Sequence, residues 1–298
     1  MQTGRRLRVA VFGNEYQLKK SSEAECVLRK LDEGGAETLL EEAFADFIAR
    51  QLPPALRHFP KFRRDEDIRA DVAISLGGDG TFLKTASFIR DSRIPILGIN
   101  TGHLGFLADV ASDTTAAAVE ALLAGKYTVE ERSVVQVETS GGTLREYPFA
   151  LNEVAILKHD NSSLINVRTE IDGELLADYV ADGLIVCTPT GSTGYSLSVN
   201  GPIISPSSKS FCISAVAPHS LNVRPVVVND DVAVALSVRT RSDKYLIAID
   251  GRSEALPKEV GITLRRAPYT IGVVKTTHRN FFETLRDKML WGADQRST

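Results

Sequence analysis

The chain has 298 residues, of which 43% are hydrophobic and 24% charged, and its formal net charge is -3. This length exceeds what one hydrophobic core usually serves, so we expect two domains with the composition of a soluble globular protein. The small negative charge gives no reason to expect nucleic acid or a membrane as a partner, and no apolar run approaches the ~20 residues that span a bilayer. Because no apolar signal region follows the N-terminus, we predict a cytoplasmic location.

Residues 1–125 alternate short apolar runs with helical patterns. Strands are predicted over 7–13, 72–76 and 96–99, and helices over 36–51, from Gly80 onward and over 114–124. Residues 14–35 are an expected polar interval, and residues 59–69 an expected mobile connection. Strands that alternate with helices predict a parallel sheet covered on both faces, with ligands at the carboxyl ends of its strands.

After Gly125 the pattern changes to strands with little helix. The dipeptides Gly141-Gly142, Asp172-Gly173 and Asp250-Gly251 are typical of hairpin turns. Strand-like runs occur over 150–157, 165–171, 184–187, 211–216, 232–238, 245–249 and 262–264. The predicted fold is therefore α/β plus all-β, with a Rossmann-like domain over 1–125 and a β-sandwich-like domain over 126–275. An amphipathic helix within 276–298 is expected to return to the first domain or to pack on another subunit.

The cysteines Cys26, Cys187 and Cys212 are odd in number and widely spaced. No two of them have the C-x-x-C spacing of a zinc or redox motif. We predict that all three are reduced and structural, and that Cys187 and Cys212, which lie in apolar strand-like runs, pack in the core.

The first candidate site is the turn Gly77-Gly78-Asp79-Gly80-Thr81, between a predicted strand and a predicted helix. Glycines there let backbone amides approach a ligand, and the helix N-terminus favours negative charge, so a phosphate is the expected guest. A carboxylate would repel a phosphate unless it holds a metal or accepts a proton from an attacking hydroxyl. The turn therefore predicts phosphoryl transfer.

The second candidate is the run from Thr188 to Ser198, in which hydroxyl groups, two glycines and Tyr195 follow an apolar strand. Many small hydrogen-bonding groups beside a ring that can stack are typical of a nucleotide pocket, although a surface loop can be as polar. The pair Asn152-Glu153 is a weaker signal that would suit vicinal ribose hydroxyls. Asp182 is ambiguous in the same way, and His103 has a phosphate-binding and a structural reading.

Together these stretches resemble the NAD kinase family, which phosphorylates the adenosine 2′-hydroxyl of NAD to make NADP. The resemblance covers the turn at 77–80, residues 100–107, the pair 152–153 and residues 182–202, in order. It implies ATP or polyphosphate as donor, NAD as acceptor, a divalent metal ion such as Mg²⁺, and a homo-oligomer, a dimer or tetramer. This chain has Gly194 where alanine is commoner and Asn200 where glycine is commoner.

The resemblance also implies roles for matching residues. Asp79 would be the catalytic base or a metal-assisted activator of the 2′-hydroxyl, with Gly80 beside NAD. Asn152 and Glu153 would bind the adenosine ribose, and Asp182 would contact the nicotinamide side. The remaining implied substrate- and nucleotide-binding residues are Gly77, Gly78, Thr81, Phe106, Thr190, Thr193, Gly194, Tyr195, Ser196, Leu197, Ser198 and Ala217.

Two alternatives remain open at this point. A lipid or sphingoid-base kinase also carries a Gly-Gly-Asp-Gly turn. Such an enzyme needs an apolar channel for its lipid acceptor, and the hydroxyl-rich run from Thr188 argues against one. A non-catalytic NAD-binding sensor is the other alternative. Asp79 argues against a sensor, because a binding protein gains nothing from a carboxylate that faces phosphates.

Overall fold

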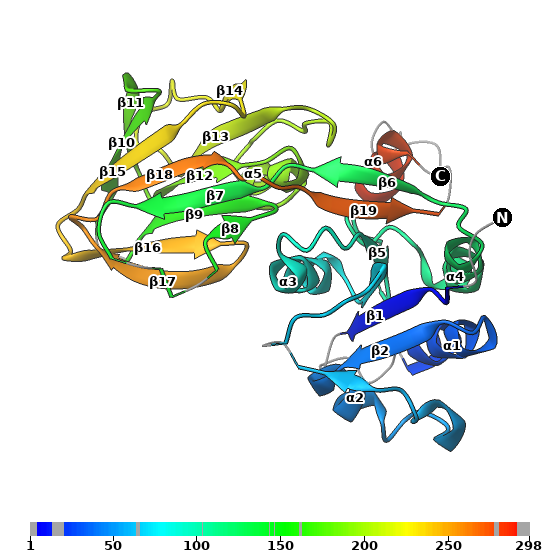
Figure 1. Cartoon of the computed structure of the whole chain (residues 1–298). Coiled ribbons are helices and arrows are strands. Elements are labelled where there is room, and N and C mark those ends of the chain that lie inside the picture. Colours follow the sequence, from blue (N-terminus) through cyan, green and yellow to red (C-terminus); the bar gives the residue numbers. More distant parts are fainter. Residues whose placement is uncertain are drawn as a thin grey trace. The chain divides into compact units, whose positions relative to one another are not determined.

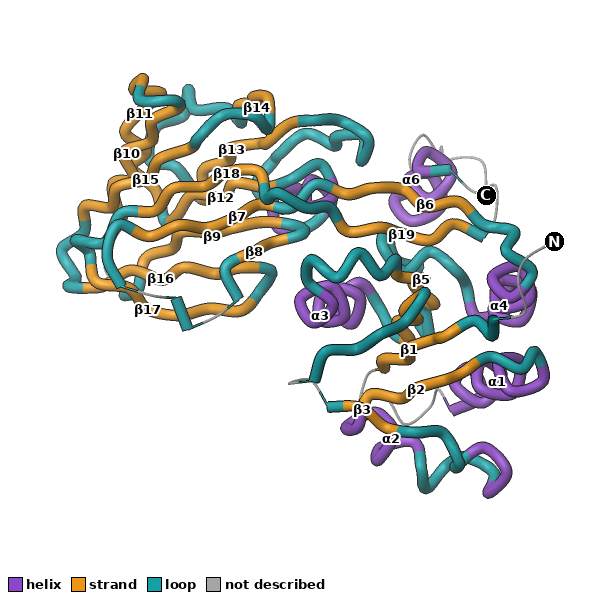
Figure 2. The backbone as a smooth tube through the Cα atoms, in the orientation of Figure 1, coloured by secondary structure: helices purple, strands orange, loops and turns teal. Residues whose placement is uncertain are grey.

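The computed structural model describes residues 5–13, 21–63, 66–102, 104–142, 144–145, 147–160, 163–276 and 280–290. The chain divides into two compact units, residues 1–131 with 271–298, and residues 132–270. The first unit mixes strands and helices, and the second consists mainly of strands (Figures 1 and 2). Among the described helices, none combines the length and the apolar character needed to cross a bilayer.

A seven-stranded sheet forms the centre of the first unit, in the order β3-β2-β1-β4-β5-β19-β6. The five neighbouring pairs from β3 to β19 are parallel. Parallel strands present their carboxyl ends at one edge, so the loops after β4 and β5 begin side by side. The strands are β1 Arg8–Gly13, β2 Glu37–Glu41, β3 Lys61–Phe62, β4 Val72–Leu76, β5 Ile96–Ile99, β6 Thr128–Arg132 and β19 Ile271–Lys275.

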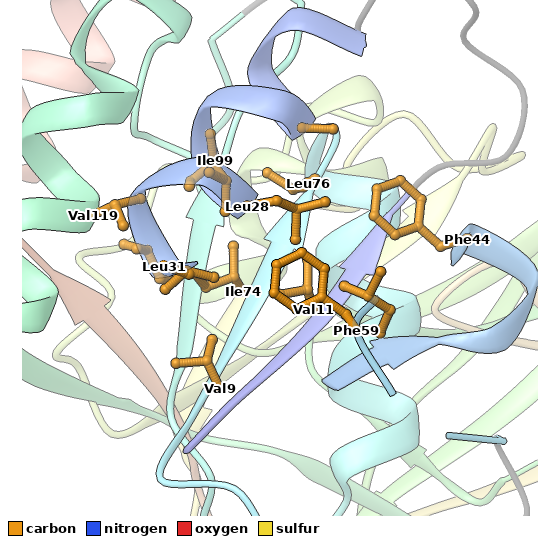
Figure 3. Close-up of a cluster of buried hydrophobic side chains, with 14 of the residues drawn as sticks. Val9, Val11, Leu28, Leu31, Phe44, Phe59, Ile74, Leu76, Ile99 and Val119 are labelled. Carbon is orange, nitrogen blue, oxygen red and sulfur yellow. The ribbon is translucent and has the colours of Figure 1, made fainter. Parts of the chain in front are cut away.

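Helices cover both faces of this sheet because the side chains of each strand alternate between the faces. On one face Val9 and Val11 of β1 join a buried cluster with residues of α1, α2 and α4 (Figure 3). On the other face the Phe12 ring lies 5.2 Å from the rings of Phe62 and Phe88, the latter on α3. The helices are α1 Ser21–Glu33, α2 Glu42–Ile48, α3 Asp79–Ile89, α4 Thr115–Leu123 and α6 Phe281–Met289.

The prediction of one helix over 36–51 is wrong, because Glu37–Glu41 is strand β2 and only Glu42–Ile48 is helical. The expected polar interval contains α1, whose apolar residues Ala24, Val27, Leu28 and Leu31 are buried at helical spacing. Its many charged residues hide this amphipathic pattern in the sequence. Part of the expected connection at 59–69 is the edge strand β3, which pairs with β2.

The second unit contains two six-stranded sheets, ordered β11-β10-β15-β18-β7-β8 and β14-β13-β12-β9-β16-β17. Both sheets are antiparallel in every neighbouring pair. Their apolar faces share one buried cluster, which makes the unit a β-sandwich. The strands are β7 Val135–Thr139, β8 Phe149–Ala150, β9 Glu153–Lys158, β10 Ile165–Ile171, β11 Glu174–Ala181, β12 Gly183–Cys187, β13 Ser210–Val216, β14 Val226–Asn229, β15 Val234–Arg239, β16 Lys244–Ile249, β17 Arg252–Pro257 and β18 Ile262–Arg266, and the short helix α5 is Tyr195–Ser198.

Two of the predicted hairpins are confirmed with the expected turn chemistry. Asp172 and Gly173 join β10 to β11 with φ of 51° and 87°, and Asp250 and Gly251 join β16 to β17 with φ of 47° and 79°. Positive φ at both central residues matches the twist of the paired strands. The predicted fold class is confirmed, including a C-terminal helix, α6, that belongs to the first unit. The domain limits at 125 and 275 stay a prediction.

Candidate functional site

The glycine-rich turn lies where the sequence predicts it, between the fully buried strand β4 and helix α3. A Cβ on Gly77 would lie 2.2 Å from Thr81 Oγ1, so only glycine fits there without a shift of the helix. Helix α3 starts at Asp79 with Gly78 as its N-cap. Because the first amides of a helix have no partner within it, this end of α3 can bind an anion.

The Asp79 carboxylate holds the loop that follows β5. Oδ1 accepts hydrogen bonds from the N–H groups of Leu107 and Ala108, and Oδ2 accepts one from the N–H of Phe106, all at 3.0 Å. The contact follows from the sheet, since β4 and β5 are parallel neighbours and their following loops share an edge. The side chain of Asp79 is 29% exposed, so its carboxylate is both anchored and accessible.

Gly105 makes this arrangement possible, because a Cβ at that position would lie 2.0 Å from Asp79 Oδ1. We expect Gly105→Ala to displace the carboxylate and to lower kcat by about tenfold or more, since small misplacements of reacting groups are costly. Steady-state kinetics with both substrates saturating measures the effect. The control is Gly141→Ala, whose new methyl group would have open space around it. Equal kcat values for the two variants would show that the loop contact does not matter.

In the second unit a carboxylate holds a turn in the same way. Asp250 accepts hydrogen bonds from the consecutive N–H groups of Leu151, Asn152 and Glu153, at 2.7, 2.8 and 3.1 Å. Asp250 lies in the β16–β17 turn, which is next to the start of β9 because β16 and β9 are paired. These bonds fix the backbone of the Asn152-Glu153 pair.

The hydroxyl-rich run packs directly on this pair. Thr188 donates its N–H to Asn152 O at 2.9 Å and its Oγ1–H to Leu151 O at 2.6 Å. A Cβ on Gly191 would lie 2.1 Å from Asn152 O, and one on Gly194 would lie 3.0 Å from Glu153 Oε2. The structure therefore brings together two stretches that lie almost 40 residues apart in the sequence.

Polar atoms at this place have no hydrogen-bond partner. Among the residues that the structure describes, Asn152 Oδ1, Glu153 Oε2 and Thr190 Oγ1 are buried and unpaired. A buried polar atom without a partner is costly, and a functional site is one of the few places where it is found. A ligand with hydroxyl or amino groups at this place would satisfy these three atoms.

Burial and the neighbouring charge of Asp250 raise the pKa of Glu153 to about 7, against the effect of a hydrogen bond from the Tyr195 N–H. Burial likewise raises the pKa of Asp250, although its three N–H bonds and Arg252 act in the opposite direction. Two carboxyl groups so close together resist simultaneous ionisation. Glu153 is therefore a group whose charge changes near neutral pH.

The raised pKa of Glu153 predicts how stability depends on pH. Its pKa in the unfolded chain is near 4.5, so between pH 4.5 and 7 the folded chain binds more protons than the unfolded chain. The free energy of unfolding therefore falls by about 1–3 kcal/mol as the pH rises through this window. We expect Glu153→Gln, which cannot ionise, to unfold at a higher urea concentration than the parent at pH 8 but at nearly the same concentration at pH 4.5. An equal difference at both pH values would contradict the assignment.

Two family models match the chain: the ATP-NAD kinase N-terminal domain over residues 13–127 and the ATP-NAD kinase C-terminal domain over residues 151–276. An NAD kinase of Bacteroides fragilis is 51% identical over 290 residues, which are 97% of this chain and 100% of the relative. An NAD kinase of Porphyromonas gingivalis is 43% identical and aligns with 97% of this chain and 99% of its own. The chain belongs to the NAD kinase family.

Solved structures of related enzymes have the same fold. A yeast NADH kinase complexed with NADH superimposes with a TM-score of 0.87 at 20% identity, over 99% of this chain and 90% of that chain. An NAD kinase from Archaeoglobus fulgidus in complex with ATP gives a TM-score of 0.71 at 23% identity, over 95% of this chain and 99% of that chain. At these identities the likeness shows the fold of the NAD kinase family alone.

The other residues that the family resemblance implies have varied surroundings. Asp182 forms an ion pair with Lys158, 2.6 Å between Oδ1 and Nζ, and both side chains are partly exposed. Ser196 is buried, and its Oγ lies 3.4 Å from Ser214 Oγ, whereas Tyr195 is 39% exposed. Ala217 is exposed and has a φ of 45°, a strained value for alanine. On α5, Leu197 is half-buried and Ser198 is exposed. The Thr193 hydroxyl donates a hydrogen bond to Thr190 O. His103 lies outside the described residues.

The family departures at 194 and 200 have physical explanations. Asn200 has a φ of 63°, in the left-handed region where asparagine is the best tolerated residue after glycine. An alanine at position 194 would place its methyl group at a tight 3.0 Å from Glu153 Oε2, so Gly194 leaves more room beside that carboxylate.

Some residues beside the candidate site of this NAD kinase family member could not be predicted from the sequence. In the sequence, Asp250 is predicted only as a turn residue. Lys288, whose Nζ lies 3.6 Å from Asp79 Oδ2, is predicted only as part of an amphipathic helix.

Cys187 and Cys212 are 25 positions apart and yet lie directly opposite each other on β12 and β13. Both cysteines are buried in an apolar cluster beneath the hydroxyl-rich run, which confirms their predicted core packing.

Proposed function

We propose that this chain transfers a phosphoryl group from ATP to the adenosine 2′-hydroxyl of NAD and so makes NADP. The observation that carries the proposal is the 51% identity to an NAD kinase across the full length of that relative. The alignment covers 97% of this chain, so it extends over both units. The geometry of each unit agrees with this reaction.

The phosphate turn would bind the donor. The N-terminal amides of α3 and the close approach permitted by Gly77 and Gly78 suit the negative oxygens of a phosphate chain. Phosphoryl transfer needs little covalent help from the protein, so positioning and electrostatic stabilisation supply most of the catalysis.

Asp79 would accept the proton of the 2′-hydroxyl. A ribose hydroxyl is a poor nucleophile at neutral pH, so its proton must leave as the bond to phosphorus forms. The carboxylate has about four acceptor positions, of which backbone N–H groups use two on Oδ1 and one on Oδ2. The remaining position of Oδ2 can take the proton while the other three hold the carboxylate in place.

The second unit would bind the acceptor. Asn152 Oδ1 and Glu153 Oε2 are buried acceptors without a partner, and vicinal ribose hydroxyls are donors that would satisfy them. Thr190 Oγ1 and the exposed ring of Tyr195 would add a hydrogen bond and a stacking surface for a base. The two unpaired oxygens of Asn152 and Glu153 would therefore bind the ribose hydroxyls of NAD.

A magnesium ion would accompany the donor. Among the described residues there is no group of three or more His, Cys, Asp or Glu side chains that could hold a metal by itself. Mg²⁺ is commonly bound by one or two carboxylates together with substrate phosphates and waters, and because the remaining position of Asp79 Oδ2 is the proton acceptor, the donor phosphates would be its main ligands. The ion would neutralise negative charge on the phosphates.

The decisive experiment incubates the purified chain with NAD, ATP and Mg²⁺ and detects NADP with an NADP-specific dehydrogenase. Parallel reactions with NADH, with polyphosphate as donor, and with sphingosine as acceptor test the substrate choice and the lipid-kinase alternative. We expect NADP to form only when the chain, a dinucleotide and a donor are all present. Tight NAD binding without any turnover would instead identify a sensor.

We also propose a homo-oligomer, a dimer or tetramer, in the cytoplasm. The edge strands β11 and β14 carry exposed apolar side chains, among them Leu175 at 52% and Val227 at 49% exposure, and exposed edges favour association. Light scattering after size-exclusion chromatography measures the number of subunits.

A further inference from the structure

The C-terminal helix α6 brings a lysine to the phosphate turn. Phe281, Leu285 and Lys288 lie at positions i, i+4 and i+7, so they share one face of the helix. Leu285 is buried, and the Phe281 ring lies 6.0 Å from the ring of Phe106 in the loop that Asp79 holds. A capping box between Asn280 and Glu283 fixes the start of the helix. The face that carries Lys288 is therefore the face that contacts Asp79 and its loop.

Lys288 contacts both parts of the Asp79 arrangement. Its Nζ lies 3.6 Å from Asp79 Oδ2 and 4.6 Å from the centroid of the Phe106 ring. A charge-assisted hydrogen bond would be 2.7–2.9 Å long, so the ammonium is attracted to the carboxylate without being locked to it. The Lys288 side chain is 35% exposed, which leaves its ammonium free to meet a second anion.

The charges around the turn create a need for such a cation. A helix N-terminus offers roughly half a positive charge, and the carboxylate of Asp79 more than cancels it. A donor with several phosphate charges would therefore meet a net negative turn. Lys288 restores a positive potential at this position, and it contacts Oδ2, the oxygen that accepts only one backbone N–H.

We propose that Lys288 binds the phosphates of the donor and serves as the counter-ion of Asp79, an inference that rests on the proposed kinase function. In the free protein the ammonium neutralises Oδ2. When the phosphates enter, it moves to their oxygens and leaves the free acceptor position of Oδ2 to the 2′-hydroxyl. No bond is formed or broken in this step.

The test compares three variants of the full chain: Lys288→Met, Lys288→Arg and Arg286→Met. Arg286 is an exposed cation on the same helix and is the matched control for a loss of charge. We expect Lys288→Met to raise the Kd for ATP, measured by calorimetry, and the KM for ATP by about tenfold, with kcat within about threefold and the KM for NAD unchanged. Lys288→Arg should restore ATP affinity, and Arg286→Met should leave it unchanged.

Three results would overturn the proposal: an ATP affinity within about twofold of the parent in Lys288→Met, an equal loss in Arg286→Met, or an equal rise in the KM for NAD. If Lys288→Met lowers the thermal midpoint by more than about 5 °C, Lys288→Gln replaces it in the same comparison. A parent chain that makes no NADP would refute the proposed function. The ATP affinities are measured without turnover, so they would still decide the role of Lys288.

Discussion

Replacing Asp79 with asparagine is expected to lower kcat by about 10² to 10⁴ while NAD still binds. The amide has nearly the shape of the carboxylate but cannot accept the proton of the 2′-hydroxyl. Calorimetry with NAD and the coupled assay for NADP measure the two quantities separately. A variant with a kcat within about twofold of the parent would refute the role of Asp79 as the base.

The asparagine also disturbs the loop, and a second comparison separates this effect from the chemistry. Both oxygens of Asp79 accept backbone N–H groups, so either orientation of the amide places its NH₂ group against a donor. Gly105→Ala disturbs the same contacts but keeps the carboxylate. We expect the loss in Asp79→Asn to exceed the loss in Gly105→Ala by about tenfold or more. Equal losses would mean that Asp79 acts only by holding the loop.

Replacing Gly191 with alanine is expected to lower kcat/KM for NAD by about 10²-fold and to destabilise the second unit by about 1–3 kcal/mol. The new Cβ would lie 2.1 Å from Asn152 O and 2.5 Å from Asn152 C, and backbone atoms cannot rotate away. The Thr188 bonds to Leu151 and Asn152 would have to lengthen, which moves the Asn152-Glu153 pair. Kinetics with NAD varied at saturating ATP and urea unfolding measure the two effects.

Gly141→Ala is again the control, because it lies in the same unit and its methyl group would meet no atom within 4 Å. We expect this control to leave kcat/KM for NAD unchanged. The KM for ATP should also stay the same in Gly191→Ala, since the phosphate turn belongs to the other unit. A Gly191→Ala variant that binds NAD normally would show that the run from Thr188 does not shape the acceptor site.

The fold class could be predicted from the sequence because the apolar runs are short, β-branched and bounded by glycine. Strand β5 has the bounds that its apolar run predicts, and the Asp-Gly turns at 172 and 250 form hairpins as expected, each after a predicted strand. Strands β6, β14 and β19 have no counterpart in the prediction. Burial in β14 alternates between exposed and half-buried, which leaves too weak an apolar pattern to detect.

The residue types of the candidate site also follow from the sequence alone. The glycine turn with Asp79, the Asn152-Glu153 pair and the hydroxyl run from Thr188 each have a composition that matches one chemical task. Their surroundings do not follow, because periodicity reports which side chains are buried but not which loop lies opposite them.

The amino-acid sequence by itself determined the two kinds of unit, and it singled out the glycine turn at 77–80, the Asn152-Glu153 pair and the run from Thr188 as candidate binding residues. Only the tertiary structure decided that Asp79 holds the amides of residues 106–108, that Asp250 holds those of residues 151–153, and that Lys288 lies beside Asp79. Residues in these contacts are up to 209 positions apart in the sequence, as Asp79 and Lys288 are (288 − 79), and Asp79 and Phe106 are 27 apart (106 − 79). The order and direction of the strands bring them together, and no local pattern of side chains encodes that order.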